Sequence, residues 1–133
     1  HGRVIVACHT PDEERLAGEL VPEIERFLAP DDYQEFTRFY SRAKFGILNR
    51  VHAGFMMASF GKPAVVIGSD SRALMMQALN LPSIFVNDVA KTGAECIVEM
   101  ARSRVGSYRD EIEDIRENAR RAYLSAIATA LET

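Results

Sequence analysis

The segment "NRVHAGFMMASFGKPAVVIGSD", residues 49–70, decides the fold that we expect for this chain. Residues 50–60 are mostly apolar, with Asn49 as the expected N-cap and Gly61 as the expected stop signal, which predicts a buried helix. Residues 64–67 (AVVI) form a short apolar run that is typical of a strand buried on both faces. A helix that returns at once to such a strand is the repeating unit of a parallel α/β sheet.

The same alternation of strand and helix extends along the chain in both directions. Further strands are predicted at residues 4–8, near Phe27, at 45–48 and at 83–86, and further helices at 11–20, 32–43, 71–79, 92–102 and 107–131. Capping boxes at Thr10/Glu13 and at Thr92/Glu95 predict two of the helix starts. We therefore expect an α/β fold, a single Rossmann-like domain over residues 1–133. It would hold a parallel sheet of about five strands with helices on both faces, a three-layer α/β/α arrangement.

Composition narrows the function classes. The 133 residues carry a net charge of -3, which gives no general attraction to nucleic acid or to anionic membranes. No apolar run reaches the roughly 20 residues that cross a bilayer. Cys8 and Cys96 lie far apart and form neither a metal-ligand pattern nor a disulfide framework, so we expect a cytoplasmic protein without a metal or other cofactor. Because the chain does not begin with Met and a strand follows almost at once, we expect it to be part of a longer protein.

Polar side chains follow three of the predicted strands. His9 follows the first strand; Asn49, Arg50 and His52 follow the strand at 45–48; Ser69, Asp70 and Arg72 follow the strand at 64–67. In parallel α/β sheets, ligands bind beyond the carboxyl ends of the strands. These residues are therefore the candidate site.

Arg50 and His52 are the most informative pair. Both are expected in the first helical turn, where free N–H groups and the helix dipole already favour negative charge, so added cations cost about 0.3–1 kcal/mol each unless an anion binds there. Arginine matches carboxylate or phosphate, and histidine binds an anion and transfers a proton near neutral pH. The alternative is that Arg50 extends into solvent and His52 is a buried histidine with satisfied partners.

The remaining candidates have equally plain structural explanations. Arg72 alone is typical of a surface arginine, Asp70 is typical of a helix cap, and His9 ends a strand where a polar residue is common. No Walker loop, dinucleotide fingerprint or zinc spacing is present. The shared position of the candidate residues at one edge of the predicted sheet is what favours a binding function.

A series of motifs resembles the C-terminal half of the polysaccharide pyruvyltransferase family. In chain order, the series is "RVHA", an apolar helix, "GKP", a strand, "SDSR" and "ALNLPSIFV". The order of elements matches over residues 4–86, and the motifs match over residues 50–72. Members of that family are similar to two-domain GT-B glycosyltransferases. They transfer the pyruvyl group of phosphoenolpyruvate to two hydroxyls of a sugar, which forms a ketal in a cell-surface polysaccharide.

The resemblance implies roles for particular residues. Arg50 would bind the carboxylate or phosphate of phosphoenolpyruvate, and His52 would be an anion ligand and the catalytic general acid. Arg72 stands where the family often has lysine, and Ser69 stands where an aromatic residue is common. The implied partners are phosphoenolpyruvate, a saccharide acceptor, an N-terminal domain outside this sequence and a second copy of the chain, in the cytoplasm near the inner face of the membrane.

Two other functions remain open. One is the nucleotide-sugar-binding half of a GT-B glycosyltransferase, although residues 51–60 lack the glutamate that often holds a ribose in such halves. The other is a non-catalytic interaction domain, for which the long final helix is a suitable surface. In every version, a GT-B-like active site lies between two domains, so we expect the chain alone to be inactive.

Overall fold

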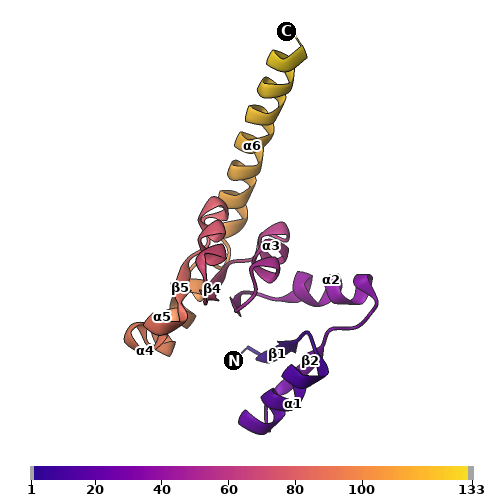
Figure 1. The fold of residues 1–133 in the computed structure, drawn as a ribbon, viewed down its shortest axis with the longest axis vertical. Coiled ribbons are helices and arrows are strands. Elements are labelled where there is room, and N and C mark those ends of the chain that lie inside the picture. Colours follow the sequence, from indigo (N-terminus) through magenta and orange to yellow (C-terminus); the bar gives the residue numbers. More distant parts are fainter. Residues whose placement is uncertain (1, 132–133) are drawn as a thin grey trace. The chain divides into compact units, whose positions relative to one another are not determined.

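A computed structural model describes residues 2–131 (Figure 1), and the chain divides into two compact units, His1–Phe39 (unit 1) and Tyr40–Thr133 (unit 2). Unit 1 contains β1 (Ile5–Cys8), α1 (Pro11–Leu20) and β2 (Glu25–Leu28), and α2 (Tyr33–Arg42) begins in it. β1 and β2 pair in parallel, with Ile5 opposite Glu25. The predicted strand–helix–strand order is confirmed here.

Local sequence signals explain the start of α1. Thr10 is the N-cap, and its hydroxyl accepts a hydrogen bond from the Glu13 backbone N–H at 3.3 Å. The Glu13 carboxylate accepts from the backbone N–H of His9 at 2.7 Å, one residue earlier than the N-cap N–H that a standard capping box uses. Pro11 occupies the first turn, where its missing N–H costs nothing.

Unit 2 holds a second parallel sheet in the order β3-β4-β5, followed by a helical C-terminal region. Its elements, in chain order, are β3 (Gly46–Leu48), α3 (Val51–Ser59), β4 (Ala64–Gly68), the 3₁₀ helix η1 (Ser71–Leu79), β5 (Ser83–Phe85), the short 3₁₀ turn η2 (Val86–Asp88), α4 (Val89–Thr92), α5 (Ala94–Arg102) and α6 (Tyr108–Leu131). The central strand β4 is the best buried, with Val65 and Val66 fully enclosed. Its apolar sequence suits a strand covered on both faces.

The α/β class with parallel strands is confirmed, whereas the expected single sheet is replaced by a two-stranded and a three-stranded sheet. All the predicted strands are present. The sequence of β2, Glu25–Leu28, helps to explain the smaller sheet, because only Phe27 of its four residues is even half-buried. A strand inside a large covered sheet is apolar throughout.

Two predicted caps are wrong. The N-cap of α3 is Arg50 rather than Asn49, and no side chain caps this helix start. The Thr92/Glu95 capping box does not form, because Thr92 ends the short helix α4, where its hydroxyl donates to the Asp88 carbonyl at 2.9 Å. The N-cap of α5 is Gly93 instead.

The predicted end of α3 is confirmed. Gly61 has a φ of +66°, its N–H donates to the Ala58 carbonyl at 2.9 Å, and the Lys62 N–H donates to the Met57 carbonyl at 3.0 Å. These two bonds form a Schellman motif, which requires a left-handed residue at this position. Glycine therefore sets where α3 stops and where the chain turns towards β4.

Helix α6 is buried only near its start. Tyr108 and Ile112 belong to the core of unit 2, but every residue from Arg116 to Leu131 is exposed. The predicted apolar stripe continues along this exposed part, where Tyr123 is 72% exposed and Leu131 is 82% exposed. Over residues 2–131, none of the helices combines the length and the apolar character that spanning a membrane requires.

Because the Tyr108 hydroxyl is buried, the free energy of unfolding is expected to fall at alkaline pH. Burial raises the pKa of Tyr108 to about 12 from an ordinary value near 10, so the unfolded chain loses this proton first as pH rises. The stability that the protonated Tyr108 hydroxyl contributes is intact below pH 10. It is lost as pH rises towards 12, at about 1.4 kcal/mol per pH unit. Urea unfolding at pH 9, 10 and 11 is expected to show a steeper loss for the wild type than for Tyr108→Phe. If the free energy of unfolding falls equally with pH in the two proteins, the pH dependence does not come from Tyr108.

Candidate functional site

The start of α3 is an uncapped, positively charged helix N-terminus. Arg50 is in an extended conformation (φ -122°, ψ 127°) directly before the first helical residue, and His52 is the second residue of the helix. Both side chains are exposed, which excludes the interpretation of His52 as a buried histidine. The first turn contains no acidic residue, and the side chain of its N-cap residue makes no capping hydrogen bond to the N–H groups there. This arrangement favours a bound anion.

At the start of η1, one carboxylate both caps the helix and pairs with the cation. Asp70 accepts a hydrogen bond from the Arg72 backbone N–H at 2.9 Å and caps the helix. The same carboxylate accepts from the Arg72 guanidinium, with Nε at 2.9 Å and Nη2 at 2.6 Å from Oδ2. These hydrogen bonds lower the pKa of Asp70 and raise the pKa of Arg72. An anion reaching Arg72 has to displace an exposed ion pair, which is a small cost.

The sheet brings these two helix starts to one edge. β3 and β4 are neighbouring parallel strands, with Leu48 opposite Val66. Adjacent strands lie about 4.8 Å apart, so the segments that leave their carboxyl ends begin close together. The candidates that this edge collects are Asn49, Arg50, His52, Ser69, Asp70 and Arg72.

His9 lies in unit 1, at the carboxyl end of β1. Its ring is half-buried and meets the Phe36 ring edge-on, with the ring centroids 5.6 Å apart. Its backbone N–H is bound by Glu13. These contacts give His9 a structural role in unit 1, beside the substrate-binding role that the sequence predicts.

Two shallow depressions of unit 2 lie away from the Arg50–His52 pair. One, of about 440 Å³, is bounded by β5, η2 and α4 and is lined in part by Phe85, Asp88 and Lys91. The other, of about 520 Å³, lies on α5 around Val98. These residues are not among the candidates that the sequence suggests: exposed Phe85 ends β5, and exposed Lys91 lies beyond η2, in α4.

Within residues 2–131, no three His, Cys, Asp or Glu side chains are grouped as metal ligands. No protein-family model matches the chain, and no curated protein or solved structure matches it either. The residues at the β3–β4 edge and their chemistry are therefore the features that bear on function.

Proposed function

We propose that this chain is the C-terminal half of a polysaccharide pyruvyltransferase that uses phosphoenolpyruvate as its donor. The observation that carries the proposal is the start of α3, where Arg50 and His52 are both exposed and the N-cap side chain makes no capping hydrogen bond. The adjacency of β3 and β4 supports it, because Arg72 begins the neighbouring helix at the same edge.

Phosphoenolpyruvate matches this set of donors. It carries a carboxylate and a phosphate, so it requires at least two groups of positive charge. The planar guanidinium of Arg50 can donate two parallel hydrogen bonds to one of the two anionic groups. The N–H groups and the dipole of the first turn of α3 stabilise the same anionic group. Arg72 binds the second anionic group once Asp70 releases it.

The proposed chemistry assigns His52 a proton transfer. Protonated His52 donates to the methylene carbon of phosphoenolpyruvate, which becomes a methyl group and leaves an oxocarbenium-like carbon. One sugar hydroxyl adds to that carbon and loses its proton, phosphate departs with its bonding electron pair, and a second hydroxyl closes the ketal and loses its proton. One of the two released protons restores His52 and the other leaves with phosphate. Arg50 stabilises the charge on the departing phosphate.

The rest of the expected architecture belongs to the same proposal. It includes an N-terminal domain that completes the cleft, a saccharide acceptor, and a cytoplasmic location near the membrane that receives the polysaccharide. The proposal also includes a second copy of the chain as a binding partner. The isolated chain is expected to bind donor without turning it over, because half of the cleft is absent.

Calorimetric titration of the chain with phosphoenolpyruvate tests the proposal. Arg50→Ala and His52→Ala are each expected to weaken binding at least about tenfold, since each removes a charge-assisted contact. Arg120→Ala is the control, because Arg120 is an exposed arginine of α6 whose partner is Glu117 at 3.9 Å. It is expected to bind as the wild type does.

The same titration with UDP-glucose and GDP-mannose separates the alternatives. Binding of a nucleotide sugar without binding of phosphoenolpyruvate would overturn the proposal in favour of a glycosyltransferase half. Absence of binding to all three ligands would favour a non-catalytic interaction domain.

A further inference from the structure

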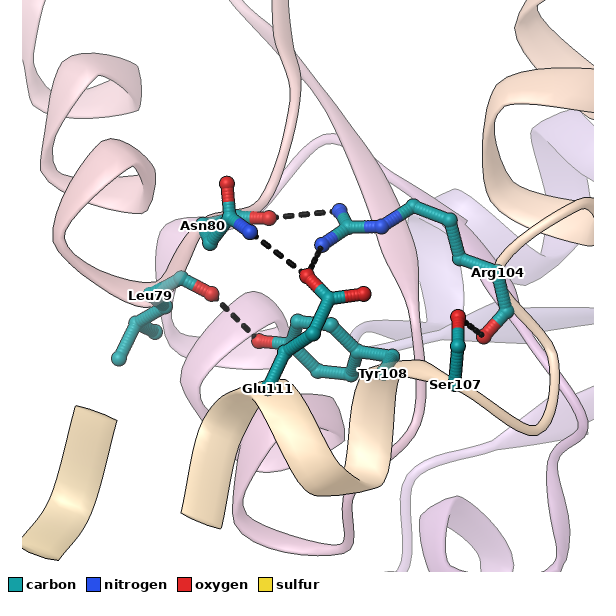
Figure 2. Close-up of polar contacts among 6 residues, drawn as sticks. All are labelled: Leu79, Asn80, Arg104, Ser107, Tyr108 and Glu111. Atoms are coloured by element: carbon teal, nitrogen blue, oxygen red, sulfur yellow. Dashed lines mark hydrogen bonds and ion pairs between the residues drawn. The ribbon is translucent and has the colours of Figure 1, made fainter. Parts of the chain in front are cut away.

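The first turns of α6, with Arg104 of the turn that precedes this helix, hold the C-terminal end of η1 (Figure 2). The Tyr108 hydroxyl donates to the Leu79 carbonyl at 2.7 Å, and the Arg104 guanidinium donates to the Asn80 carbonyl at 2.6 Å. The Asn80 amide donates to the Glu111 carboxylate at 2.6 Å, and Glu111 also pairs with Arg104. Each of the last backbone carbonyls of a helix lacks a partner within the helix, so these bonds satisfy groups that would otherwise need water.

The same helix also holds the C-terminal end of α3. The Arg116 guanidinium donates to the Ala58 carbonyl at 3.1 Å and to the Ser59 carbonyl at 2.8 Å. A cation at the C-terminal end of a helix is also favoured by the dipole. We call Arg104, Tyr108, Glu111 and Arg116 the α6 clamp.

The clamp residues that contact η1 are better shielded than an ordinary surface network, whereas Arg116 is exposed. Tyr108 is fully buried, and the Arg104 and Glu111 side chains are 20% and 34% exposed. Ion pairs and hydrogen bonds that are partly removed from water hold their geometry more firmly than exposed ones. The guanidinium of Arg104 also lies 4.9 Å from the centre of the Tyr108 ring, which adds a cation–π contact.

We infer that the α6 clamp sets the tilt of α3 and η1, and thereby positions the Arg50–His52 pair relative to Arg72. This inference rests on the proposed function. Each helix is attached to the sheet at its start, α3 through β3 and η1 through β4, and to α6 at its end. Two points of attachment determine the direction of a short rigid helix. The clamp residues are therefore positioning residues, at the opposite end of both helices from the anion.

The chemistry of the donor makes this inference testable. Phosphoenolpyruvate has two anionic groups, and it bridges the two helix starts only when their spacing is correct. Inorganic phosphate needs one helix start alone. Loss of the clamp therefore weakens phosphoenolpyruvate binding selectively, whereas a general loss of folding weakens both ligands.

Two clamp variants remove contacts with little other change. Tyr108→Phe combined with Asn80→Gly removes the Tyr108 hydroxyl and the Asn80 amide, and glycine accepts the φ of +52° found at Asn80. Arg116→Met removes the donors to α3 and keeps a long side chain. Arg120→Met is the matched control, one turn further along α6, because Arg120 is paired only with Glu117 among the described contacts.

Titrations with phosphoenolpyruvate and with inorganic phosphate are the first measurement. Both clamp variants are expected to raise the phosphoenolpyruvate Kd about fivefold or more, with the phosphate Kd changed less than about twofold. Arg120→Met is expected to leave both values unchanged. Equal weakening of the two ligands, or no weakening in either clamp variant, would overturn the inference.

The angle between α3 and η1, measured from residual dipolar couplings of their backbone amides, is the second measurement. It is expected to change in the clamp variants and to stay constant in Arg120→Met. A constant angle in all variants would overturn the inference even if phosphoenolpyruvate binds. If the wild type does not bind phosphoenolpyruvate, the proposed function fails, and the angle alone still decides whether the clamp sets the tilt.

Discussion

If the proposed function is correct, His52→Ala is expected to slow pyruvyl transfer by the two-domain enzyme about 10²–10⁴-fold, the range that a positioned general acid contributes. In the proposed mechanism, His52 donates the proton that makes the enol carbon electrophilic. Its side chain is exposed in the first turn of α3, so its removal leaves no cavity in the core. The melting temperature is therefore expected to stay within about a degree or two, as for other exposed surface substitutions. Initial rates of phosphate release from phosphoenolpyruvate, with a saccharide acceptor present, provide the measurement.

Gln77→Ala is the control for this experiment, because Gln77 is an exposed residue of η1 and lies away from the helix start. It is expected to retain the wild-type rate. Two results would count against the role of His52: a rate that survives the substitution, or a melting temperature that falls in step with the rate. The second result would indicate that His52 contributes to the stability of the fold and not to catalysis.

Gly68→Ala is expected to destabilise unit 2 by about 1–3 kcal/mol, the usual cost of overpacking a core. A Cβ at Gly68 would lie 2.2 Å from the Cβ of Ala73, and both residues are buried where β4 meets η1. Neither atom is at the end of a flexible side chain, so the backbone itself has to move. Urea unfolding measures the loss.

A rescue variant and a control make this prediction specific. Ala73→Gly, added to Gly68→Ala, removes the atom that clashes, and we expect part of the lost stability to return. Gly18→Ala is the control, because the atoms nearest to a Cβ there belong to the Arg26 side chain, at 3.5 Å or more, and alanine would favour the helical state of α1. A Gly68→Ala protein as stable as the Gly18→Ala protein would show that the close packing of β4 on η1 is wrong.

Much of the secondary structure was predictable because its signals are local. The start of α1 at Thr10 and the ends of α3 and η1 at Gly61 and Asn80 depend on residues within a few positions of each boundary. The prediction failed where two signals competed over the same few residues. Thr92 resembles an N-cap in the sequence, but the preceding turn at Asp88 binds its hydroxyl first, so the helix start moves to Gly93.

The candidate site was predictable only in part. The rule that ligands bind beyond the carboxyl ends of parallel strands selects Arg50, His52 and Arg72 from the sequence, and β3 and β4 are indeed neighbours. Whether a cation at that edge is already paired is a matter of side-chain rotamers, which a sequence pattern does not specify. The engagement of Arg72 by Asp70 is therefore a finding of the structure.

For this protein, sequence alone determined the order of strands and helices, the parallel α/β class and the edge at which polar residues gather. These features follow from apolar periodicity and from caps, which act over a few neighbouring residues. Tertiary structure alone decided that the strands form two sheets and that α6 binds the ends of α3 and η1. Arg116 and Ala58 are 58 positions apart, and Tyr108 and Leu79 are 29 apart. Contacts at such separations depend on how packed elements meet in space, and the residues beside each partner in the chain carry no signal for them.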